Sequence, residues 1–151
     1  MTGNFTGPLS AALNWGFERD GNQDGIPDAW TKTTSAHEVS LVSDNVHGGQ
    51  KAVRIVTERT YLQYQITQYV PVTAQTSYTL TYWVWCESGG WGCGFRSGDL
   101  ARDLGYLTDS GATGGWVQRQ VPLNTGSETR VFLFFCNNYP GEGSALSGWM
   151  M

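Results

Sequence analysis

Residues 14–30 read NWGFERDGNQDGIPDAW and place oxygen-bearing side chains at alternate positions, followed by a glycine and a proline. Calcium takes about six to eight oxygen ligands, and this spacing lets one short loop curl around one ion. The candidate ligands are the side chains of Glu18, Asp20, Asn22, Asp24 and Asp28 and the carbonyl of Ile26. The segment therefore predicts a structural calcium site. The alternative is a surface turn in which the carboxylates cap their own backbone amides.

The loop is not an EF-hand. An EF-hand has a bidentate Glu at its twelfth position, but that position is Thr31 here, and no helical pattern flanks the segment.

The same segment also carries a family resemblance. Its Asn-x-Gly-Phe-Glu opening, its Asp/Gly/Pro-rich loop and the closing Trp30 resemble the start of carbohydrate-binding modules of the xylan- and glucan-binding superfamily. Residues 46–55 and 69–80 resemble two later strand segments of those modules, so the resemblance covers roughly residues 13–151. It implies an all-β fold, a β-sandwich jelly roll. The chain departs from the family near its end, where Ser147-Gly148-Trp149 replaces an acidic motif that helps to bind calcium.

Composition agrees with one all-β domain. Charged residues make up only 15% of the 151 residues, aromatic residues 13%, and β-branched and aromatic runs are short, with no long helical periodicity. The net charge of −4 leaves no basic patch for nucleic acid or for an anionic membrane. Residues 1–10 have no basic region and no apolar run, so we expect neither a signal peptide nor a membrane anchor there.

The chain is expected to consist of an extended N-terminal arm, residues 1–12, and a single β-sandwich domain, residues 13–151. The arm is rich in small residues and needs a partner to become ordered, which suggests assembly into a homo-oligomer or with neighbouring proteins.

Strands are expected at residues 39–43, 51–57, 61–70, 77–86, 95–96, 104–107, 116–123, 130–137 and 145–151, with a glycine-rich turn at 89–95. In residues 61–70, alternation assigns Leu62, Tyr64 and Ile66 to the core, and the other residues to a polar and aromatic outer face. In residues 77–86, the family resemblance implies that Tyr78 and Leu80 face inward. The apolar run at 130–137 predicts a strand buried on both faces.

Catalytic motifs are missing from the sequence. The acidic residues outside the first loop are scattered, and there is no Gly-x-Ser-x-Gly elbow. We therefore expect no enzymatic activity. Cys86, Cys93 and Cys136 make an odd count; one Cys86–Cys93 bridge is conceivable, but buried free thiols are favoured.

Aromatic side chains flanked by amides and charged groups suit either sugar stacking or a protein interface. The candidate glycan- or partner-binding residues are Trp83, Trp85, Tyr61, Gln63, Gln65, Tyr69 and Arg119. Two interpretations remain. The favoured one is a virion decoration or attachment protein of a bacteriophage capsid or tail, made in the host cytoplasm. The alternative is a xylan- or β-glucan-binding module of a secreted glycoside hydrolase.

Overall fold

The computed structural model describes residue 14 and residues 16–33, 37–57, 65–87, 89–137 and 142–147. The strands are β1 (Thr31–Lys32), β2 (His37–Val42), β3 (Ala52–Thr57), β4 (Ile66–Pro71), β5 (Ser77–Cys86), β6 (Gly90–Ser97), β7 (Asp103–Ser110), β8 (Val117–Asn124), β9 (Arg130–Asn137) and β10 (Glu142–Ser147). Over these ranges we find no helix long and apolar enough to cross a membrane.

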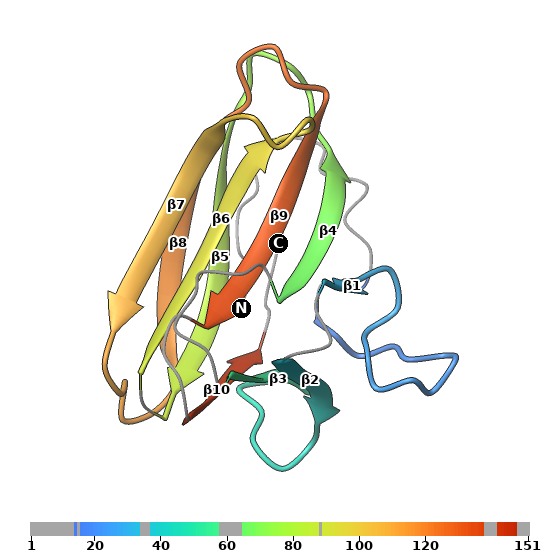
Figure 1. The fold of residues 1–151 in the computed structure, drawn as a ribbon, viewed down its shortest axis with the longest axis vertical. Helices are drawn as coiled ribbons and strands as arrows, with labels where there is room; N and C mark the ends of the chain where they lie inside the picture. Colours follow the sequence, from blue (N-terminus) through green and yellow to red (C-terminus); the bar gives the residue numbers. More distant parts are fainter. Residues whose placement is uncertain are drawn as a thin grey trace.

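The strands form two antiparallel five-stranded sheets. Sheet A has the order β1-β4-β9-β6-β7, and sheet B has the order β2-β3-β10-β5-β8. Figure 1 shows sheet A in front of sheet B, with the first loop beside β1 at the lower right. The predicted fold class, an all-β jelly-roll sandwich, is confirmed.

Alternation along β5 sets the core as expected. Its even-numbered residues, from Tyr78 to Cys86, are at most 5% exposed and pack between the sheets, whereas Trp83 and Trp85 lie on the outer side. The prediction that β9 is buried on both faces is also confirmed. Leu133 and Phe135 belong to the inter-sheet core, while Phe132 and Phe134 form a separate cluster on the outer side of sheet A.

The first loop contributes directly to the core. Phe17 is fully buried, and its ring lies 5.1 Å from the ring of Trp30 and 6.4 Å from that of Phe135. The Trp30 indole donates a hydrogen bond to the carbonyl of Asn14 (3.3 Å). The two ends of the loop are thus anchored, and the polar segment between them projects as a turn.

The predicted turn at residues 89–95 is wrong, because most of this segment belongs to β6. Trp91, Cys93 and Phe95 alternate into the core, so the intervening glycines occupy the outer face of the same strand. Glycines are typical of turns, but the alternation of the three apolar residues between them is the pattern of a strand with one buried face.

Gln65 is fully buried, so the structure does not present it as an exposed binding residue, although alternation with the core residue Ile66 keeps it on the outer side of sheet A. The backbone carbonyl of Gln65 accepts a hydrogen bond from the Thr33 amide, and the backbone amide of Gln65 donates one to the Phe135 carbonyl. Gln65 therefore lies within sheet A, beside β9. Tyr61, Gln63 and the predicted arm, residues 1–12, lie outside the described residues. All three cysteines are free and buried, as favoured.

Candidate functional site

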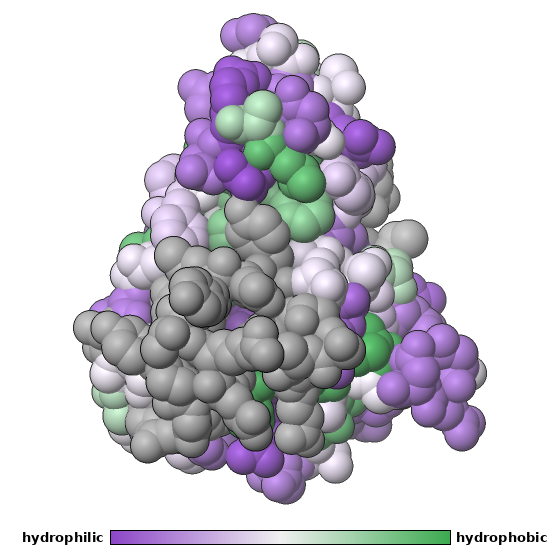
Figure 2. Space-filling view, viewed as in Figure 1, coloured by the Kyte–Doolittle hydropathy of each residue, from purple (hydrophilic) through white to green (hydrophobic). Residues whose placement is uncertain are grey.

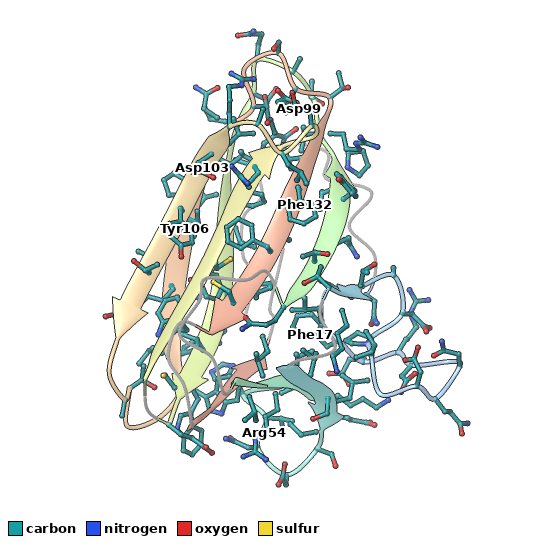
Figure 3. The ribbon with its side chains drawn as sticks, in the orientation of Figure 1. Phe17, Arg54, Asp99, Asp103, Tyr106 and Phe132 are labelled. Atoms are coloured by element: carbon teal, nitrogen blue, oxygen red, sulfur yellow. The ribbon has the colours of Figure 1, made fainter. Side chains whose placement is uncertain are left out.

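The outer face of sheet A carries four aromatic rings that follow one another across the strands. Tyr69 on β4 contacts Phe132 on β9 (5.1 Å between ring centroids), and Phe132 neighbours Phe134 (6.4 Å). Phe134 in turn lies 5.7 Å from Tyr106 on β7, with 35° between the ring planes. We call these four residues the aromatic face. Figure 3 shows Tyr106 and Phe132 on the side of sheet A that faces the viewer.

Glycines in β6 shape this face. A Cβ atom added at Gly94 would lie 2.8 Å from the Tyr106 ring and 3.0 Å from the Phe134 ring. A Cβ at Gly92 would lie 2.8 Å from the Tyr106 hydroxyl and 2.9 Å from the Cys136 sulfur. Real Cβ atoms do not make contacts this short. The bare backbone of β6 therefore lets the Tyr106 ring lie down against the sheet.

Tyr69 and Tyr106 are the large hydrophobic residues that the described structure leaves most exposed, at 45% and 42%. Phe132 and Phe134 between them are only 7% and 3% exposed. The two tyrosines are separated by three strand spacings across the sheet and by two residues along the strands. These offsets place their Cα atoms about 16 Å apart. This separation exceeds one sugar ring and suits an extended ligand.

A charged rim borders the aromatic face where β6 turns into β7. Arg96 pairs with Asp103 (2.9 Å), and Arg102 pairs with Glu128 (2.6 Å). Leu100, in the turn, packs on the Phe132 cluster. Figure 2 shows apolar atoms near the upper end of this side of the molecule, surrounded by hydrophilic ones.

Two further groups complete the rim. The guanidinium of Arg130 lies over the Tyr69 ring, 4.5 Å from its centroid. The Asp99 carboxylate accepts hydrogen bonds from the Ser97 hydroxyl (2.5 Å) and the Ala101 amide (3.0 Å), which hold the pKa of Asp99 below its usual value.

Two predicted binding residues, Trp83 and Trp85, lie on the opposite side of the molecule, on the outer face of sheet B. The His47 imidazole stacks on the Trp83 ring at 3.7 Å and 16°, so one face of that indole is already covered. Trp85 meets Trp116 edge to face at 6.1 Å. Partial burial lowers the pKa of His47.

Arg119 does not join either outer face. It is the β8 partner of the fully buried Tyr82, so its side chain starts on the inner side of sheet B. There it pairs with Asp109 (3.2 Å) and lies 5.9 Å from the Trp91 ring. Among the predicted binding residues that the structure describes, only Tyr69 belongs to the aromatic face.

The carboxylates of the first loop are engaged with backbone amides. Asp20 accepts from Asp24 (3.2 Å) and Gly25 (3.1 Å), and Asp28 accepts from Gly21 (3.0 Å). These bonds match the alternative of a self-capped turn.

Two more ligand candidates are bound in the same way. Asp24 accepts from the Ile26 amide (2.8 Å), and Glu18 accepts from the Gln50 amide (3.0 Å). Within the described ranges, no group of three or more His, Cys, Asp or Glu side chains is placed to hold a metal. Calcium in this loop therefore stays a prediction.

Sequence reasoning missed Tyr106, Phe132 and Phe134. A usable signal was present in the alternation Gly90-Trp-Gly92-Cys-Gly94-Phe, which predicts a strand with one apolar face and one face without side chains. Rings on neighbouring strands can then lie over the glycine backbone.

Comparison with known proteins gives matches at the level of structure. No protein-family model matches the sequence, and neither does any curated protein. The CBM22-1 xylan-binding domain of Xyn10C from Paenibacillus barcinonensis has a TM-score of 0.62 and 14% identity, over 89% of this chain and 88% of that one.

Two enzyme structures also contain a similar fold. Arabinose-bound MgGH51 α-L-arabinofuranosidase has a TM-score of 0.68 and 14% identity over 91% of this chain, which spans only 25% of that enzyme. A cyclase from Fischerella sp. TAU, in complex with 4-(1H-indol-3-yl)butan-2-one, has a TM-score of 0.65 and 13% identity, over 91% of this chain and 92% of that one. At these identities the matches show a jelly roll like that of carbohydrate-binding modules.

Proposed function

We propose that the protein is a non-catalytic glycan-binding module and that a polysaccharide lies across the aromatic face of sheet A. The observation that carries the proposal is the Tyr106 ring, which lies against the glycines of β6 and is 42% exposed. A flat, amphipathic ring with one open side is suited to the apolar face of a sugar ring. Tyr69 offers a second exposed ring at the other end of the row.

The rim supplies the polar half of such a site. Sugar hydroxyls need donors and acceptors beside the stacking rings. Arg96, the β6 partner of Phe132, lies next to the aromatic face and pairs with Asp103, and Arg102 lies in the adjoining turn. Because these groups are tied in ion pairs, they are held in place before a ligand arrives, which reduces the entropy lost on binding.

The structural neighbours support this function better than the virion-decoration interpretation. One neighbour is named as a xylan-binding domain and another as an arabinose-bound enzyme, whereas none of those described above is named as a virion protein. We therefore propose polysaccharide as the partner, in the setting of a secreted module. Fold alone does not decide between such uses.

A second candidate is binding of a flat aromatic small molecule. The Fischerella cyclase holds an indole ketone on the same fold, and an open tyrosine ring could stack an indole as well as a sugar. The two candidates differ in ligand but share Tyr106.

Affinity electrophoresis in gels that contain arabinoxylan, glucuronoxylan or mixed-linkage β-glucan tests the proposal. We expect at least one of these polysaccharides to retard the wild-type protein, and we expect Trp83→Ala to be retarded equally. If a polysaccharide retards the wild-type protein but not Trp83→Ala, the site lies on sheet B. No retardation in any gel would refute glycan binding, and indolyl-butanone binding by calorimetry would then favour the second candidate.

A further inference from the structure

Arg130 differs from the other arginines of the rim. Arg96 and Arg102 each contact a carboxylate, but Arg130 has no acidic partner within 4 Å among the residues that the structure describes. Instead, its guanidinium lies over the Tyr69 ring, 4.5 Å from the centroid, and donates a hydrogen bond to the Gly98 carbonyl (3.3 Å). Its charge is therefore held in place without being neutralised by an ion pair.

This geometry prepares the guanidinium for an anion. A guanidinium is planar, has five N–H donors and binds carboxylates through two parallel hydrogen bonds. Stacking on Tyr69 fixes the plane, and one contact to Gly98 uses only part of the donor set. Arg130 is itself exposed, so the remaining donors can reach a ligand. Fixing the side chain in advance lowers the entropic cost of binding.

The neighbouring carboxylates are already occupied. Both oxygens of Glu128 are used, one by the Gly98 amide (3.1 Å) and the other by Arg102 (2.6 Å). Asp99 is bound within its own turn. The rim holds three arginines, including Arg96, and three carboxylates, including Asp103, so its net charge is zero. Any preference for an anion must come from local geometry.

We propose that Arg130 and Tyr69 form a subsite for a carboxylate-bearing sugar, a uronic acid, at one end of the aromatic face. The inference rests on the proposed function, because it requires a glycan on that face. The uronic acid ring packs against the exposed part of Tyr69, and its carboxylate accepts from Arg130. The ligand class is thus an acidic substituted polysaccharide, such as a xylan with glucuronic acid side groups.

The test compares glucuronoxylan with the same polysaccharide after its carboxyl groups have been reduced to alcohols. The two ligands share backbone and linkage, so their affinity ratio isolates the carboxylate. By isothermal titration calorimetry, we expect the wild-type protein to bind the native form roughly tenfold more tightly, the value of one charge-assisted hydrogen bond. The ratio should shrink as salt is added, because the subsite is exposed.

Two variants localise the effect. Arg130→Gln should bring the ratio close to one while binding to the reduced polysaccharide persists. Arg130→Lys should keep only part of the preference for the native polysaccharide, since an ammonium keeps the charge but loses the planar, bidentate geometry. Arg54→Gln, on β3 in sheet B, makes the same change in net charge away from the aromatic face and should leave the ratio unchanged.

Three results would overturn the inference. Equal binding of the two forms by the wild type would remove the subsite and leave glycan binding intact. If the protein binds another polysaccharide but neither native nor reduced glucuronoxylan, the subsite is likewise removed and glycan binding is left intact. A preference that survives in Arg130→Gln would assign it to another residue. If the protein binds no polysaccharide at all, the proposed function itself fails.

Discussion

Replacing Tyr106 with alanine tests the aromatic face most directly. The change removes the ring that lies over Gly92 and Gly94 and exposes bare backbone in its place. The rest of the sandwich should remain folded, because Tyr106 lies outside the inter-sheet core, on the outer side of sheet A, where its ring pairs with that of Phe134. Truncation to alanine is expected to cost about 4 kcal/mol of stability: about 3 kcal/mol for the roughly 120 Å² of the side chain that folding buries, and about 1 kcal/mol for the ring pair with Phe134.

The loss of affinity can be worked from the exposed area. An aromatic side chain offers roughly 200 Å², of which 42% is accessible at Tyr106, leaving about 80 Å² for a ligand to cover. At about 25 cal/mol per Å², covering this area is worth about 2 kcal/mol. The dissociation constant of Tyr106→Ala for a bound polysaccharide should therefore rise roughly 30-fold.

Isothermal titration calorimetry with the tightest polysaccharide from the gel panel measures this change. Tyr106→Phe is the matched control, because it keeps the ring and removes only the hydroxyl, which lies 3.9 Å from the Cys136 sulfur. It should retain most of the affinity. If Tyr106→Ala melts as a folded protein and binds within a factor of two of the wild type, the reasoning that places the ligand on this ring is wrong.

Three other predictions concern stability. If calcium occupies residues 20–28 as the sequence predicts, EDTA should lower the melting temperature; an unchanged melt would leave the loop to its own hydrogen bonds. Burial raises the pKa of Cys136 to about 12 and that of Cys93 well above its usual value of 9.0. The unfolded chain then loses thiol protons that the folded chain keeps, so urea-derived stability should fall as the pH rises above 9.0; constant stability to about pH 10.5 would contradict this. Glu18→Ala removes carboxylate contacts to the Gln50 amide (3.0 and 3.1 Å) and should lower the unfolding free energy by about 1–2 kcal/mol in urea titrations, whereas an unchanged value would show that the tether carries no stability.

Much of the fold could be predicted because two strands obey simple rules. The alternation from Tyr78 to Cys86 indicates a strand with one buried face, and the apolar run of β9 indicates a strand with two buried faces. Both patterns depend on local side-chain periodicity, which the sequence displays directly. The β6 strand was missed because its glycines are also typical of turns, and only the sheet partners β7 and β9 show that the segment is extended.

The candidate site was harder to predict because it depends on pairing between distant strands. Tyr69, Phe132 and Tyr106 are far apart in sequence, and the order β4-β9-β6-β7 brings them onto one face. Sequence reasoning instead grouped Trp83 and Trp85, which are neighbours on one strand, with Arg119, whose side chain starts on the opposite side of sheet B. Strand order, which local patterns do not specify, determines which aromatic residues share a face.

The comparison of the two outer faces explains why an exposed aromatic residue is not by itself a binding surface. On sheet B, the imidazole of His47 covers one side of Trp83, and Trp85 contacts the edge of Trp116, so part of each ring is already in contact with a neighbouring side chain. On sheet A, the underside of Tyr106 rests on backbone that has no side chains, so its contact with the protein leaves the outer side open. A ligand that needs a flat apolar surface meets a more exposed ring in the second arrangement, because Tyr106 is 42% exposed whereas Trp83 and Trp85 are only partly exposed. This difference follows from Gly92 and Gly94, and it is the physical reason for placing the ligand on sheet A.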